Sequence, residues 1–89
     1  MNVQILTPEK VILDAEVESI KVPGMEGDFQ ILKNHAAIIS SLRNGTIQIK
    51  GTSLIDSPYL KKGEGNSFVY EIKGGVIEFN SNKAIILCD

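Results

Sequence analysis

His35 and Cys88 are the residues of this sequence whose side chains could carry proton-transfer or nucleophilic chemistry near neutral pH. They are its only histidine and its only cysteine. An imidazole can act as a base at this pH, but no serine or cysteine is placed to serve as its nucleophile. We therefore interpret His35 as a turn or interface residue and Cys88 as a buried, inert thiol in an apolar strand. No catalytic residue is predicted.

The sequence also predicts no metal or cofactor site. Metal ions need clustered histidine, cysteine or carboxylate ligands. One histidine and one cysteine at distant positions do not form such a cluster. Residues 63–65 and 74–75 are rich in glycine, but neither stretch is followed by the lysine of a phosphate-binding loop. Both stretches are interpreted as turns.

An exposed acidic loop is predicted around Glu26 and Asp28. Pro23 presets φ for a turn, and Gly24 can adopt the positive φ that the next turn position requires. Gly27 permits a second tight reversal. The two carboxylates are therefore expected on a solvent-facing tip. Three apolar residues should then return the chain to the interior: Phe29, Ile31 and Leu32.

The elements that must position this loop are strands, because apolar and polar residues alternate with a period of two. The apolar positions expected to face the core are Val3 and Ile5, Val11 and Leu13, Ile20 and Val22, Ile47 and Ile49, Phe68, Tyr70 and Ile72, Ile77 and Phe79, and Ile85 and Leu87. Val17 lies out of phase, which indicates a bulge or a passage from one sheet to the other. We predict an all-β fold, an antiparallel two-sheet β-sandwich of about ten short strands, as one domain over residues 1–89.

Two segments are ambiguous from the residues alone. Residues 34–42 carry apolar side chains at helical spacing after Asn34, which could be an N-cap, so a short helix competes with an extended path. Residues 51–67 include Pro58 and the adjacent pair Lys61 and Lys62. We interpret this second segment as a long, exposed, partly ordered hairpin connection.

The composition is that of an ordinary soluble domain, with 43% hydrophobic residues, 22% charged residues and a net charge of −2. This balance argues against a nucleic-acid-binding barrel, which needs a basic face and aromatic stacking platforms. No apolar run approaches the ~20 residues that cross a bilayer. The single cysteine and the lack of a signal peptide favour a reducing interior.

Three blocks of the sequence carry a family resemblance. They are residues 3–24, residues 22–37 and residues 74–89. In this order the blocks resemble the N-terminal β-sandwich domain of the epsilon subunit of F-type ATP synthases. The chain departs from the family at Gln30, where glycine is usual, and at Lys33 and Ala37, where proline is usual. Without the two prolines, φ is no longer fixed there and the local path is less rigid.

The resemblance implies an extended path for residues 34–42 and a non-catalytic subunit of the central rotor stalk. Such a subunit links the gamma subunit to the membrane c-ring and couples proton-driven rotation to ATP synthesis. It lies peripherally, on the cytoplasmic face of the bacterial inner membrane. Longer members continue into a pair of C-terminal helices, which restrain rotation or bind ATP. Residues 1–89 contain no such pair, so neither activity is expected.

The contact residues that the resemblance implies fall into two groups. The loop that faces the c-ring comprises Glu26, Gly27, Asp28 and Phe29. The stretch near the gamma subunit comprises His35, Ala36, Ile38, Ile39 and Leu42, for which core packing is the competing interpretation. Acidic side chains in the loop would complement a basic residue of the c-ring.

A carrier or ligand-binding small β domain is the alternative function. Such carriers display a lysine on a hairpin tip for attachment of a cofactor. Lys61 or Lys62 lies in a loop of this kind, but the usual Met-Lys or Asp-Lys setting is absent. This alternative is therefore the weaker hypothesis.

Overall fold

The structure, a computed structural model, describes residues 1–51 and 57–89. Within these residues the chain forms strands without helices, so no helix there could cross a membrane. The strands are β1 (Asn2–Leu6), β2 (Val11–Glu16), β3 (Ser19–Gly24), β4 (Gly27–Leu32), β5 (Ile38–Leu42), β6 (Gly45–Lys50), β7 (Lys61–Lys62), β8 (Ser67–Ile72), β9 (Gly75–Asn80) and β10 (Lys83–Cys88). The all-β prediction and the number of strands are confirmed for the described residues.

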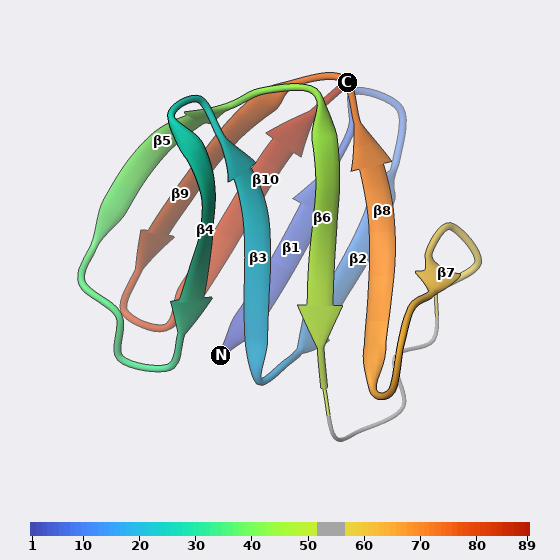
Figure 1. The fold of residues 1–89 in the computed structure, drawn as a ribbon, viewed down its shortest axis with the longest axis horizontal. Helices are drawn as coiled ribbons and strands as arrows, with labels where there is room; N and C mark the ends of the chain where they lie inside the picture. Colours follow the sequence, from blue (N-terminus) through green and yellow to red (C-terminus); the bar gives the residue numbers. More distant parts are fainter. Residues whose placement is uncertain (52–56) are drawn as a thin grey trace.

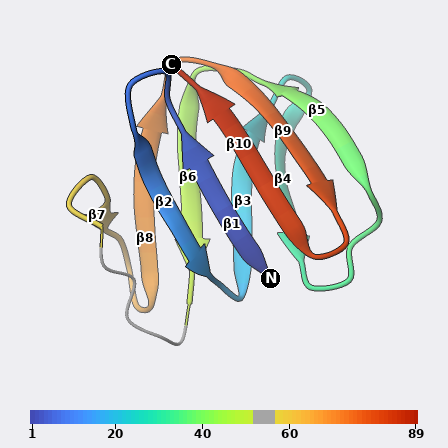
Figure 2. The ribbon, with the colours of Figure 1, turned by 180° about the vertical axis from the view of Figure 1, so that it is seen from behind.

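The strands form one continuous hydrogen-bonded path that curls into two facing layers. The order along the path is β2-β1-β10-β9-β5-β3-β6-β8-β7, with β4 added on the free side of β3. Strands β4, β3, β6 and β8 face the viewer in Figure 1, and β2, β1, β10, β9 and β5 face the viewer in Figure 2. The layers meet where Gly24 of β3 pairs with Leu42 of β5.

The prediction of a wholly antiparallel sheet is wrong at one pair of strands. Strand β1 runs parallel to β10, with Asn2 opposite Lys83 and Leu6 opposite Leu87. The remaining recorded pairs are antiparallel. A parallel pair cannot be joined by a short turn, and here nearly the whole chain separates the two strands.

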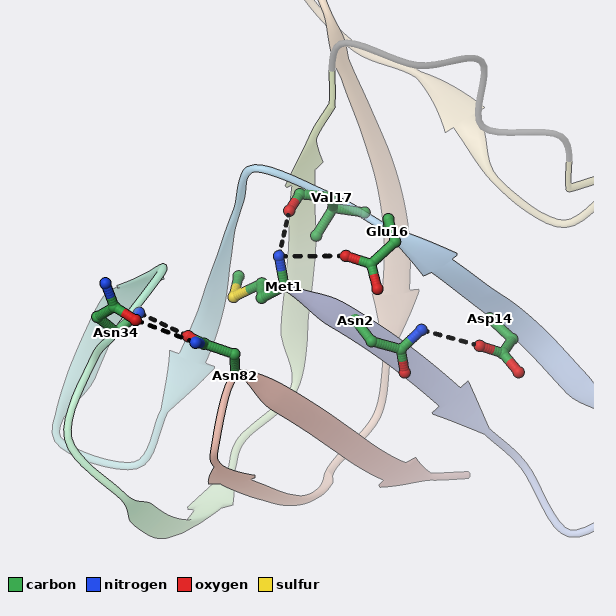
Figure 3. Close-up of polar contacts among 7 residues, drawn as sticks. All are labelled: Met1, Asn2, Asp14, Glu16, Val17, Asn34 and Asn82. Carbon is green, nitrogen blue, oxygen red and sulfur yellow. Dashed lines mark hydrogen bonds and ion pairs between the residues drawn. The ribbon is translucent and has the colours of Figure 1, made fainter.

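The chain crosses between layers at Val17, which explains its shifted phase. Strand β2 ends at Glu16 in one layer and β3 begins at Ser19 in the other. The Met1 ammonium group donates a hydrogen bond to the Val17 carbonyl oxygen at 3.0 Å, and it lies 3.4 Å from a Glu16 carboxylate oxygen (Figure 3). The Val17 amide in turn donates to the Met1 carbonyl oxygen at 2.8 Å. The crossing is therefore tied to the start of β1.

The core lies between the layers and follows the predicted alternation in most strands. Ile5, Ile47 and Phe79 are fully buried. Two strands have a different phase. In β2, Val11 is 56% exposed and Ile12 is buried, because the register with β1 shifts between Ile5 and Leu6.

In β10 the prediction of which residues face the core is wrong. Leu87 is 55% exposed and Ile85 is partly exposed. The residues that face the core are Ala84, Ile86 and Cys88. Alternation could not settle this phase because both faces of β10 carry apolar side chains.

Residues 34–42 take the extended path, and the helical alternative is wrong. A turn at Lys33 and Asn34 leads through an irregular stretch into β5. The Asn34 amide donates to Asn82 Oδ1 at 2.6 Å, and Asn82 Nδ2 donates to Asn34 Oδ1 at 3.0 Å (Figure 3). Both asparagines have positive φ, which this residue type tolerates better than most. This pair joins the β4–β5 loop to the β9–β10 hairpin.

Candidate functional site

The predicted acidic tip is present, but its turn lies two residues later than expected. Pro23 and Gly24 are buried at the end of β3, and the reversal occurs at Met25 and Glu26. A Cβ on Gly24 would lie 2.7 Å from the Gly27 carbonyl oxygen, so glycine is needed there for close strand approach and not for a positive φ. Gly27 does have a positive φ, of 135°.

Glu26 and Asp28 both reach solvent, yet their electrostatic surroundings differ. Asp28 Oδ1 forms an ion pair with Nη2 of Arg43, the residue directly after the end of β5. Within the described part of the chain, Glu26 has no ion-pair partner. The neighbouring Met25 is 63% exposed. Glu26 is therefore the carboxylate of the tip that is available to an external cation.

Phe29 differs from the other residues of the predicted c-ring-facing group. Its side chain is half-buried and packs against the core. Its ring lies close to Gly24, where an added Cβ would be 2.8 Å away. Phe29 therefore supports the tip from beneath, while Leu32, which was expected in the interior, is 54% exposed.

The predicted gamma-facing group separates into surface and core residues. His35 and Ala36 are exposed, and Ile39 is 72% exposed. Ile38 is half-buried against the core. Leu42 is only 4% exposed and belongs to the core, because it points inward where the two layers join. Leu42 is therefore unavailable to a partner.

His35 is held in place by contacts within the chain, as expected for a turn histidine. Its ring meets the Phe79 ring edge-on, with centroids 6.0 Å apart. Its Nδ1 lies 2.7 Å from the Ala36 carbonyl oxygen, and its amide donates to the Leu32 carbonyl oxygen at 3.1 Å. These contacts fix the loop that leads into β5.

An apolar outer face on the layer of β5, β9, β10, β1 and β2 was not predicted. In register, Val76 lies opposite Leu87, Leu87 opposite Leu6, and Leu6 opposite Val11. Val76, Leu87 and Val11 are 43%, 55% and 56% exposed. We call this surface, together with Ile39 and Ile85, the apolar outer face. Contiguous exposed apolar surface of this kind marks interaction sites.

Two further titratable groups of the described residues, Cys88 and Tyr70, have raised pKa values. Burial raises the pKa of the Cys88 thiol, and the nearby negative charge of Asp89 raises it further as the smaller cause. The reactive thiolate is therefore disfavoured. Burial raises the pKa of Tyr70 as well, with Cys88 as a second cause. The described residues contain no group of three or more potential metal ligands.

Lys61 and Lys62 do not occupy the position that a carrier lysine needs. Both lie in β7, paired with Val69 and Phe68 of β8, and residues 63–66 form the turn that follows. The Lys62 ammonium group lies 5.9 Å from the centre of the Phe68 ring. Most of the predicted hairpin connection is thus described here, but residues 52–56 of it lie outside the described residues.

The fold and these surfaces define a small β-sandwich that presents an acidic tip and an apolar face to other molecules. The family model described as the ATP synthase delta/epsilon chain β-sandwich domain matches residues 1–89. The chain belongs to this family.

Curated relatives agree with the family match. The ATP synthase epsilon chain of Chlorobium limicola is 37% identical over 88 residues, which cover 99% of this chain and 88% of the relative. The ATP synthase epsilon chain of Leptospira borgpetersenii serovar Hardjo-bovis strain JB197 is 37% identical over 89 residues. This chain spans 61% of that second relative.

Solved structures show the same fold. A chain in the central stalk and c-ring of Tetrahymena thermophila mitochondrial ATP synthase superposes with a TM-score of 0.74 at 22% identity, covering 98% of this chain and 61% of its own length. A chain of Euglena gracilis mitochondrial ATP synthase gives a TM-score of 0.78 at 20% identity, covering 97% of this chain and 48% of its own length.

Proposed function

We propose that this chain is a non-catalytic central-stalk subunit of a proton-translocating F-type ATP synthase. It joins the gamma subunit to the membrane c-ring, so that proton-driven rotation of the ring reaches the catalytic head. The observation that carries this proposal is the family match over the whole of residues 1–89. Curated epsilon chains of similar length, such as that of Chlorobium limicola, support it.

The two exposed surfaces suit a part that has two neighbours. The acidic tip lies at the turn between β3 and β4, in the layer that faces the viewer in Figure 1. The apolar outer face belongs to the other layer, whose strands face the viewer in Figure 2; its Val76 and Leu87 lie near the same end as the tip, and Ile39 and Ile85 lie farther along their strands. One partner can therefore contact the tip while another covers the face. We assign the tip to the c-ring and the face, including Ile39, to the gamma subunit.

The physical requirement on such a subunit is stiffness. Ladder hydrogen bonds run through every neighbouring pair of strands in the path, and the side chains between the layers are closely packed. Packed protein interiors are nearly incompressible, so they transmit force with little deformation. The asparagine pair and the Met1 contacts fasten the loops at the end opposite the tip (Figure 3).

Membership of an ATP synthase associates the chain with a membrane through its partners. We place it on the cytoplasmic face of the bacterial inner membrane, where an F-type rotor meets the c-ring. Membership of the complex is supported by the relatives named ATP synthase epsilon chain from Chlorobium limicola and Leptospira borgpetersenii.

The proposed function predicts a stable complex with the gamma subunit. When the purified chain is mixed with the gamma subunit of the same organism, the two should elute together from a size-exclusion column. The complex should then bind detergent-solubilised c-ring. The chain alone should bind the c-ring more weakly, because the acidic tip is then its single contact with the ring and gamma adds none of its own. Separate elution of the chain and the gamma subunit would contradict the proposal.

Reversal of the charge of Glu26 should impair coupling. Glu26→Lys is expected to weaken contact with the c-ring by roughly 1.4-fold to fivefold, since an exposed ion pair contributes about 0.2–1 kcal/mol. The measurement is the ratio of ATP synthesised to protons moved in membrane vesicles reconstituted with the variant. Glu64→Lys, in the exposed turn before β8, is the control and should leave the ratio unchanged.

Asp28→Asn provides the contrasting case at the same tip. Because Arg43 already pairs with this carboxylate, its replacement should loosen the loop but change coupling less than Glu26→Lys does. Equal coupling in Glu26→Lys vesicles and wild-type vesicles would remove the acidic tip from the mechanism.

A further inference from the structure

Glu78 is a carboxylate that lies between two apolar residues of the apolar outer face. In the β-ladder it lies opposite Ile39 on one side and Ile85 on the other. Its own side chain is exposed, and Ile39 beside it is 72% exposed. A partner that covers these apolar side chains must also cover the carboxylate. Burial of a carboxylate is costly unless an opposite charge or hydrogen-bond donors accompany it.

The other acidic residues of this layer's outer side already have partners within the chain. Asp14 accepts hydrogen bonds from Asn2 Nδ2 at 3.2 Å and from Gln4 Nε2 at 3.4 Å. Glu16 lies 3.4 Å from the Met1 ammonium group (Figure 3).

Glu78 has no such partner among the described residues. Lys83 lies on the same side of the neighbouring strand, opposite Asn80, but no ion pair joins it to Glu78. Glu78 is therefore the carboxylate of this face that is left for an external cation.

An open pocket lies directly beside Glu78. It has a volume of about 340 Å³ and is lined by Ala37, Ile38, Ile39, Glu78, Phe79 and Asn80. We call it the β5–β9 pocket. Its walls are mainly apolar, and Glu78 supplies its carboxylate. A long basic side chain matches this arrangement, because its methylene stem packs on apolar surface while its charged end stays at the polar rim.

We propose that the β5–β9 pocket receives one arginine or lysine side chain of the gamma subunit. The aliphatic stem lies against Ala37 and Ile39, and the cationic end binds the Glu78 carboxylate. This inference rests on the proposed function, because it names the gamma subunit as the partner of the apolar outer face. The charge pair fixes the orientation of the partner on a face whose remaining apolar contacts are not directional.

The test compares dissociation constants for the gamma subunit, measured by isothermal titration calorimetry at low and high salt. Glu78→Gln keeps the shape of the side chain and removes its charge, so it should weaken binding about tenfold at low salt. The wild-type affinity should fall with salt, and that of Glu78→Gln should fall less. Glu71→Gln, exposed on β8 in the other layer, is the matched control and should bind as the wild type does.

Charge reversal extends the test to the partner. Glu78→Lys should weaken binding by more than Glu78→Gln, because two cations would then meet in the pocket. Among single Arg→Glu and Lys→Glu variants of the gamma subunit, one should bind Glu78→Lys more tightly than wild-type gamma does. Thermal unfolding of each variant confirms that the domain is folded.

The outcomes separate this inference from the proposed function. If the wild-type chain binds gamma, and Glu78→Gln binds equally well with the same salt dependence, the pocket is not a cation site and the function stands. If the wild-type chain does not bind gamma, the proposed function and this inference both fail. A tenfold loss confined to the Glu78 variants supports the inference.

Discussion

Ile39→Glu is expected to weaken binding to the gamma subunit by roughly 100-fold while the domain stays folded. Ile39 is 72% exposed, so its replacement removes little from the core. In the complex, however, the new carboxylate would be buried beside Glu78, which lies opposite it in β9. Two like charges in an apolar interface, one of them unpaired, account for the size of the loss.

The matched control for this substitution is Leu32→Glu. Leu32 is 54% exposed on β4, in the layer opposite the apolar outer face. The Leu32→Glu variant should bind gamma as the wild type does. Both Leu32→Glu and Ile39→Glu should unfold at denaturant concentrations close to that of the wild type. Undiminished binding of a folded Ile39→Glu domain would show that gamma contacts a different surface.

Phe79→Ala should produce the largest loss of stability of any single truncation in the described core. Phe79 is fully buried near the end of β9, between β5 and β10. Truncation of a buried phenylalanine removes its transfer free energy and leaves a cavity, which together cost about 3–5 kcal/mol. That loss is a large fraction of the 5–15 kcal/mol by which small domains are typically stable. Urea denaturation followed by circular dichroism measures the change.

Leu87→Ala is the control for the loss of stability. Leu87 is also an apolar residue in a strand, but its side chain is 55% exposed. Its truncation should therefore change the free energy of unfolding by no more than about 0.5 kcal/mol. Phe79→Ala should also free the His35 ring, whose edge-on contact with Phe79 it removes. A loss below about 1 kcal/mol for Phe79→Ala would mean that the core repacks around the missing ring.

The sequence was most informative where one face of a strand is apolar and the other polar. In β6, Ile47 and Ile49 alternate with Thr46 and Gln48, and both isoleucines are fully buried as predicted. Such alternation fixes which face is inside, because a shift of one residue would place the polar side chains in the core. The all-β fold could therefore be predicted from the residues and from the family resemblance.

The sequence was misleading where both faces are apolar. Ile85, Ile86 and Leu87 are consecutive, so alternation cannot decide which of them face the core. The structure buries Ile86 and exposes Leu87, and the exposed set forms part of the apolar outer face. The unbroken apolar run in residues 84–88 was thus the available sequence signal for a second apolar surface.

The candidate surfaces were predictable in location but not in detail. Glu26 and Asp28 were correctly expected at an exposed tip, yet the pairing of Asp28 with Arg43 joins residues that local patterns do not connect. The family resemblance grouped Leu42 with Ile39 on one surface, but residues three apart in a strand point to opposite faces. The assignment of these surfaces to the c-ring and to gamma remains a prediction.

The place of β10 between β1 and β9 has a consequence for biosynthesis. This strand follows the other nine described strands in the sequence, yet it occupies the middle of its layer. While the ribosome is still adding residues 83–88, the first hairpin, β1–β2, has nothing to pair with on its open side. Contacts between residues so distant in sequence slow the search for the native state. Until residues 83–88 have been synthesised, the backbone groups on one edge of β1 therefore lack their native partner strand, and unpaired strand edges of this kind are prone to wrong pairing.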